Sequence, residues 1–95
     1  MDQNMIRKMQ KLQQELEDKT AVFLEQEFTI TKHGVTIVAK GSKQIVSITI
    51  EDNDLLDPED PEILQDILQL ALNELFDDID EKQKALMPNI PGLGF

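Results

Sequence analysis

Residues 35–50 read Val-Thr-Ile-Val-Ala-Lys-Gly-Ser-Lys-Gln-Ile-Val-Ser-Ile-Thr-Ile, and this stretch decides the fold. Val35, Ile37 and Ala39 alternate with residues 36, 38 and 40, and a similar alternation resumes after a short polar segment. β-Branched residues at a period of two, interrupted by Gly and Ser, predict two strands joined by a tight turn. The rest of the chain is arranged around this hairpin.

Both faces of the predicted hairpin carry apolar residues. Alternation places Val46, Ile48 and Ile50 in one row, and we expect Val38 and Ile45 on the face opposite the main apolar row. A helix of the same chain can cover one face, and a second chain is the simplest cover for the other. We therefore predict a homodimer with Val38 and Ile45 in its interface.

Size and composition limit the class of protein. The chain of 95 residues supports one small domain, which buries only about 60–65% of its unfolded surface, so that association would stabilise it. The absence of Cys excludes disulfides, thiolate metal sites and a cysteine nucleophile. No export signal and no apolar run of about 18 residues is present, and we expect a cytoplasmic, soluble protein.

The net charge of −10 is unevenly distributed. Residues 1–45 contain seven basic and six acidic residues, whereas residues 46–95 contain two basic and thirteen acidic residues. The molecule as a whole would repel nucleic acid. Any nucleic-acid contact must therefore come from the first half.

A helical arm is predicted for residues 1–25. Its apolar residues form one narrow stripe with spacings of four, three and four, namely Met5, Met9, Leu12 and Leu16. Such a stripe is typical of a helix that packs through a single seam. Arg7, Lys8 and Lys11 fall on the other side, where two interpretations remain open: a solvated helix face or a patch that contacts phosphate.

A three-stranded sheet is predicted within residues 26–51. Its first strand covers residues 27–32, and His33-Gly34 forms the next turn, which is the simplest role for the single histidine. Residues 52–63 have the acidic character of a calcium loop, but Asp57 stands where that loop requires glycine. No metal site is expected there.

A second helix is predicted for residues 60–87, with Asp60 as N-cap and Pro61 as its first residue. A broad apolar face suited to covering a sheet contains Leu64, Ile67, Leu68, Ala71, Leu72, Leu75 and Ile79. Its acidic side, which includes Asp77 and Asp78, is interpreted as solvated rather than as a cation site. Residues 88–95 are predicted to form a flexible tail, because it begins with proline and cannot continue the helix. The tail is apolar enough to dock somewhere and irregular enough to be loose.

No catalytic arrangement is present in the sequence. No nucleophile stands beside a base, no Gly-rich loop opens a helix, and no cofactor is indicated. With no Trp or Tyr and four Phe, stacking of single-stranded bases is poorly supported. We expect that the protein is not an enzyme.

The sequence resembles the YbaB/EbfC family of bacterial nucleoid-associated proteins over nearly its whole length. The resemblance rests on an ordered set of segments: Met9-Gln-Lys-Leu-Gln-Gln-Glu-Leu16, Gly34-Val-Thr-Ile-Val-Ala-Lys-Gly41, Val46-Ser-Ile-Thr-Ile50, Leu55-Leu56-Asp57, Leu64-Gln-Asp-Ile-Leu68, Ala71-Leu-Asn-Glu74 and the Pro-Gly-Leu-Gly-Phe ending. It implies an α+β homodimer shaped like tweezers (α-β-β-β-α), in which the sheets meet and the N-terminal helices project.

The resemblance also implies a function. Members of the family bind duplex DNA with little sequence preference and are linked to nucleoid organisation and gene expression. The expected partners are double-stranded DNA and a second copy of the chain, without a membrane or a small-molecule substrate. The expected location is the nucleoid of the cytoplasm.

Two departures from the family pattern affect the predicted DNA contacts. The Gly-rich loop often found before the second strand is reduced to His33-Gly34. Asp77 and Asp78 stand where the family commonly has basic residues. The predicted DNA-binding residues are therefore Arg7, Lys8, Lys11, Lys40 and Lys43. The alternative function is an acidic module that binds protein partners and holds DNA weakly or not at all.

Overall fold

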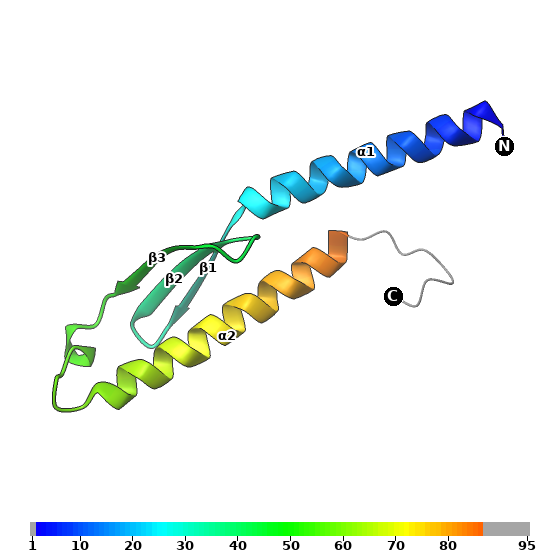
Figure 1. Ribbon diagram of the computed structural model, residues 1–95. Helices are drawn as coiled ribbons and strands as arrows, with labels where there is room; N and C mark the ends of the chain where they lie inside the picture. Colours follow the sequence, from blue (N-terminus) through cyan, green and yellow to red (C-terminus); the bar gives the residue numbers. More distant parts are fainter. Residues whose placement is uncertain (1, 87–95) are drawn as a thin grey trace.

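The computed structural model describes residues 2–86 and has the predicted α+β order (Figure 1). Its elements are α1 (Gln3–Glu25), β1 (Glu27–Lys32), β2 (Val35–Lys40), β3 (Ile45–Ile50), a 3-10 turn η1 (Asn53–Leu55) and α2 (Pro61–Leu86). The order helix, three strands, helix is confirmed. The predicted tail of residues 88–95 lies outside the described residues.

The sheet is antiparallel with β2 in the centre. Directly paired residues point to the same face, so the pairs Phe28–Ala39 and Ile37–Ile48 define the apolar face. The opposite face is mostly hydroxylated, and its paired residues are Glu27, Thr29, Thr31, Thr36, Val38, Lys40, Ser47 and Thr49. One face of the sheet is therefore apolar apart from Lys32, and the paired residues of the other are polar apart from Val38.

The position of Ile45 differs from the prediction. Ser47 pairs with Val38, but the next pair is Ile45 with Ala39, because the register shifts between Val38 and Ala39. β3 therefore contains one extra residue, which is a β-bulge. Because side chains alternate between the two faces, one extra residue moves the side chain beyond it to the face opposite the one that strict alternation predicts. The prediction that Val38 and Ile45 share a face is therefore wrong: Ile45 lies on the side of the core.

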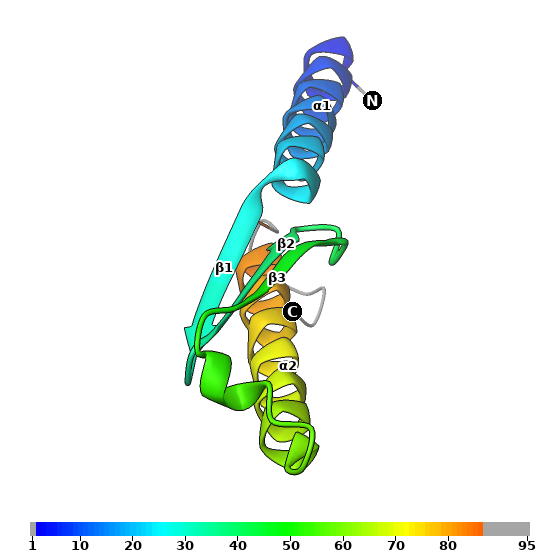
Figure 2. The ribbon, with the colours of Figure 1, turned by 90° about the vertical axis from the view of Figure 1, so that its left-hand side faces the viewer.

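α2 covers the apolar face only in part. It packs chiefly against β1 and β2, behind the sheet in Figure 2. The buried core contains Phe23, Phe28, Val35, Ile37, Ala39, Ala71, Leu75 and Ile79. A helix is about 10 Å wide and strands are about 4.8 Å apart, so one helix covers about two strands. On β3, Ile45 remains 37% exposed and Ile48 remains 47% exposed.

The base of α1 is fixed to the turn between β2 and β3. The amide of Gly41 donates to the carbonyl of Gln26 at 2.9 Å, and the amide of Ser42 donates to the carbonyl of Leu24 at 3.2 Å. A Cβ at Gly41 would lie 2.1 Å from the carbonyl oxygen of Phe23, so only glycine permits this close approach. Phe23 is buried, and its ring centroid lies 5.3 Å from that of Phe28.

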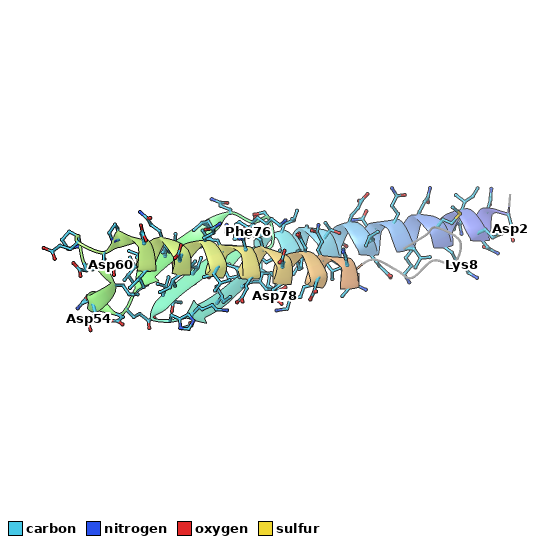
Figure 3. All side chains as sticks on the ribbon, turned by 90° about the horizontal axis from the view of Figure 1, so that it is seen from below. Asp2, Lys8, Asp54, Asp60, Phe76 and Asp78 are labelled. Carbon is cyan, nitrogen blue, oxygen red and sulfur yellow. The ribbon has the colours of Figure 1, made fainter. Side chains whose placement is uncertain are left out.

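Beyond this base, α1 projects away from the sheet as an arm (Figures 1 and 3). The molecule is correspondingly elongated, with a longest extent of 70 Å. The apolar stripe is exposed over the outer arm, where Met5 and Met9 are each 56% exposed and Leu12 is 65% exposed. The predicted helix is confirmed, but packing through its apolar stripe stays a prediction, because only the inner end of α1 is packed.

Candidate nucleic-acid interface

The outer half of α1 carries a small group of unopposed positive charges. Residues 3–14 include Arg7, Lys8 and Lys11 and no acidic residue. All three side chains are exposed, and none forms an ion pair within residues 2–86. We call these three residues the basic arm patch. A phosphate group could approach any of the three without displacing a carboxylate partner.

The other two predicted DNA-binding residues are already paired with carboxylates. Lys40 Nζ lies 2.9 Å from Glu25 Oε2, and Lys43 Nζ lies 2.7 Å from Asp80 Oδ1. Lys43 also lies over the ring of Phe76, 5.9 Å from its centroid. A phosphate that approached either lysine would meet a neighbouring negative charge. These lysines tie the sheet to the two helices, a role that the sequence did not indicate.

The structure does not bring the five predicted residues into one patch. Lys11 precedes Glu25, the partner of Lys40, by fourteen residues, which corresponds to about 21 Å along the helix axis. The basic arm patch therefore stands apart from the lysines at the base of the arm.

The arm also separates the positive patch from the acidic second half. Asp80 and Lys84 of α2 line an open cleft with Thr20 of α1, where the two helices come close. Lys11 lies nine residues, or about 13 Å, farther along the arm than Thr20. The Debye length is about 8 Å at physiological salt, so repulsion by the acidic residues of α2 is largely screened there. Figure 3 shows this separation between Lys8 and Asp78.

Residues 2–86 contain neither a cluster of metal ligands nor a helix that could span a membrane. Within residues 2–86, no group of three or more His, Asp or Glu side chains is arranged to hold a metal ion. His33 is exposed in the β1–β2 turn, where it has a φ of 48° and Gly34 has a φ of 85°. Consecutive positive φ values are typical of a tight hairpin turn, which confirms the predicted turn role. No helix in this part of the chain is long and apolar enough to cross a membrane.

The uncovered side of β3 is a second surface of interest. Ile45 and Ile48 lie on the same face as the core, at the edge strand that α2 leaves open. The predicted interface contains Ile45 but not Ile48, because strict alternation places Ile48 in the main apolar row, which a helix can cover. No residue pattern marks which strand a single helix leaves uncovered.

This fold, with a basic arm on a small acidic body, matches a known class of proteins. The model of the YbaB/EbfC DNA-binding family matches residues 1–93, and the chain belongs to this family. The family is one of DNA-binding proteins and not one of enzymes.

Particular relatives support the same assignment. A nucleoid-associated protein of Mycoplasmopsis pulmonis is 41% identical over 87 residues, which cover 92% of this chain and 86% of the relative. A nucleoid-associated protein of Streptococcus agalactiae is 36% identical over 92 residues, with 95% and 92% of the two chains covered. The crystal structure of an uncharacterised Helicobacter pylori protein matches with a TM-score of 0.61 and 28% identity, over 86% of this chain and 93% of that one.

Proposed function

We propose that this protein is a homodimeric, nucleoid-associated protein that binds duplex DNA through the basic arm patch. The observation that carries the proposal is the separation of charge: three exposed, unpaired cations lie on a projecting helix beyond the acidic body. Membership of a DNA-binding family and the names of its relatives support the same function.

Binding of this kind reads the phosphate backbone rather than the bases. The patch contains one arginine and two lysines on one helix, and cations of this kind contact phosphates without reading the sequence. We expect little sequence preference. Two arms offer at most six phosphate contacts, and each contact contributes roughly 0.9 to the slope of log affinity against log salt, so the limit is about −5. A fraction of these contacts gives a slope of about −3 and micromolar affinity.

The dimer would cover the apolar surface that one chain leaves open on β3. Ile45 and Ile48 are partly exposed beside the core, and an uncovered apolar edge strand favours association. Val38 was also predicted in the interface, and it lies half-buried on the hydroxylated face. We retain Val38 as a proposed contact but expect Ile45 to contribute more.

The DNA proposal is tested by changing Arg7, Lys8 and Lys11 together to Gln. We expect affinity for all duplexes to fall alike and the salt slope to flatten by about 2–3, because these phosphate contacts are lost. The measurement is fluorescence anisotropy with two unrelated duplexes at several salt concentrations. The matched control changes Lys19, Lys82 and Lys84 to Gln, which alters net charge equally but leaves the basic arm patch intact.

Two outcomes would contradict this proposal. Equal losses in the arm variant and the control would show that net charge, not the arm, determines binding. Absence of binding by the parent protein at about 50 mM salt, where backbone contacts are strong, would favour the acidic protein-interaction module instead.

The dimer proposal is tested by comparing Ile45→Asp with Val38→Asp. We expect the parent to be a dimer at micromolar concentration by light scattering, and Ile45→Asp to raise the dissociation constant at least about a hundredfold, because a charge would be buried at an apolar contact. Val38→Asp should have the smaller effect. A monomeric parent, or a dimer unaffected by Ile45→Asp, would place the architecture or the interface elsewhere.

A further inference from the structure

The apolar stripe of α1 continues beyond the packed base of the arm. Phe23 is buried at that base, and Leu16 and Met9 precede it by seven and fourteen residues, so these three side chains face the same way on the helix. Leu16 is half-buried, whereas Met5, Met9 and Leu12 are each more than half exposed. The stripe over residues 5–16 is therefore an apolar surface that the rest of residues 2–86 leaves largely uncovered.

The spacing of this stripe is that of a contact between two helices. Its four residues are separated by four, three and four positions, which is the repeat of helices that pack side by side in a coiled coil. The same repeat identifies the residues that flank the contact. Lys8 directly precedes Met9 and Glu15 directly precedes Leu16, so Lys8 and Glu15 lie on the same flank of the stripe.

The charges along the stripe have no partners among the described residues of their own chain. Lys8 and Glu15 are exposed, and they are about 10.5 Å apart along the helix axis, too far for an ion pair within α1. Neither they nor Asp2 and Lys19, which continue the repeat at the two ends of the stripe, form an ion pair within residues 2–86. The outer half of α1 is thus positive, whereas residues 15–25 contain four acidic residues and one lysine.

We propose that the arms of two copies of this chain pair with each other, antiparallel, along the apolar stripe. In the register that packs Met9 against Leu12 of the second copy, Met5 packs against the second copy's Leu16. The same contacts recur about the two-fold axis of the pair, so all four residues of each stripe are covered.

This register also satisfies the charges beside the stripe. Lys8 of each copy lies next to Glu15 of the other, because these positions flank neighbouring layers of an antiparallel pair. One layer farther out, Asp2 of each copy lies next to Lys19 of the other, so that opposite charges close the stripe at both ends.

Charge selects the antiparallel direction over the parallel one. A parallel pair would bring the two basic arm patches side by side, and it would place Lys8 and Glu15 beside the uncharged Gln13 and Thr20. The antiparallel pair also puts the two bodies at opposite ends, because α1 projects away from the sheet (Figure 1). Arm pairing therefore joins chains of different dimers, if the sheets meet within each dimer as proposed above.

The length of the contact fits the free part of the arm. Residues 5–16 span about 17 Å of helix, and the contact ends before Thr20, where α2 comes close to α1. About twelve residues per chain is roughly half of what a standard interface contains, so we expect association to be weak. Arg7 and Lys11 lie away from the stripe and stay exposed, and the inference does not depend on DNA binding.

Cysteine cross-linking tests the pairing and its direction, because the chain has no native Cys. The variants Met9→Cys and Leu12→Cys, one of them carrying a tag that changes its mass, are mixed without DNA and oxidised mildly. We expect the mixed disulfide to form at least about fivefold faster than either like product, because only the antiparallel pair brings positions 9 and 12 together. The matched control mixes Gln10→Cys with Gln14→Cys, which lie off the stripe, and should cross-link at least about fivefold more slowly.

The products decide the outcome. Faster formation of the like products would indicate a parallel pair and would overturn the proposal. Equal rates in the test and the control would also overturn it, because no face of the arm would then be preferred.

Charge reversal tests the register. Lys8→Glu in both cysteine variants should slow the mixed disulfide at least about fivefold, because two pairs of like charges then face each other. Lys8→Glu in the Met9→Cys chain, combined with Glu15→Lys in the Leu12→Cys chain, should restore the rate, because both pairs are opposite again.

The control for charge reversal is Lys11→Glu in both cysteine variants. It changes the net charge by the same amount as Lys8→Glu but lies away from the stripe, so we expect less than about twofold slowing. Equal slowing by the two reversals, or no recovery in the combination of Lys8→Glu with Glu15→Lys, would overturn the proposal.

Discussion

The two helices of this protein have similar lengths but opposite relations to the sheet. α1 has 23 residues and buries only Phe23, whereas α2 has 26 residues and buries Ala71, Leu75 and Ile79. The side chains of α2 are held by β1 and β2, while most of α1 depends on helix propensity and on its anchored base. Both helices have apolar residues at helical spacing, but these residues become buried mainly where the helix packs against the sheet. The consequence is that one helix stabilises the fold and the other is available for binding.

The largest difference between the helices should appear in stability. Leu75 is 1% exposed and Leu12 is 65% exposed. Leu75→Ala should lower the free energy of unfolding by about 2–5 kcal/mol, because it leaves a cavity between α2 and the sheet. Leu12→Ala should change it by less than about 0.5 kcal/mol, because the side chain of Leu12 is exposed. Urea unfolding of both variants at equal protein concentration measures the contrast, and similar losses would show that α1 belongs to the core.

A smaller difference should separate the lysines at the base of the arm from those on the arm. Lys40→Gln with Lys43→Gln should flatten the salt slope of DNA binding by less than about 1, because each lysine is already paired with a carboxylate. The change in stability should also be below about 1 kcal/mol, since these pairs are partly exposed. Anisotropy titrations beside the triple arm variant make the comparison. A loss as large as that of the arm variant would move the main DNA contact to the base.

The smallest expected effect concerns the acidic side of α2. Calcium or magnesium titrated calorimetrically should give no micromolar binding, because the carboxylates of α2 within the described residues are not gathered into a ligand cluster. Asp77→Asn with Asp78→Asn should leave the titration unchanged. Micromolar binding that disappears in this variant would show a cation site on α2.

Much of the fold was predictable because local patterns agree with the tertiary structure. Alternation located all three strands, the Asp60-Pro61 step placed the start of α2, and the helical spacing of the apolar stripe located α1. The bulge in β3 was not predictable, because Ile45 and Val46 are residue types that are as common in a regular strand as in a bulged one. The error moved Ile45 to the wrong face, and with it the expected location of the interface.

The candidate site was predictable only in outline. Charge counting placed the basic residues in the first half, but it could not separate free cations from paired ones. Lys40 and Lys43 have carboxylate partners on α1 and α2, one of them thirty-seven residues away in the sequence. Only the three-dimensional packing of helix, turn and helix shows that pairing.

The close approach of Gly41 to Phe23 gives the molecule a mechanical property. Two hydrogen bonds, and the room left by the missing side chain of Gly41, fix the C-terminal end of α1, while about 30 Å of helix extends beyond Phe23. A tilt of ten degrees at this pivot would move the far tip by roughly 5 Å, which is more than the rise of about 3.4 Å between successive phosphates of one strand. The direction of the arm is thus set by the contacts at the C-terminal end of α1. In the proposed dimer, the distance between the two tips would depend on this pivot in each chain.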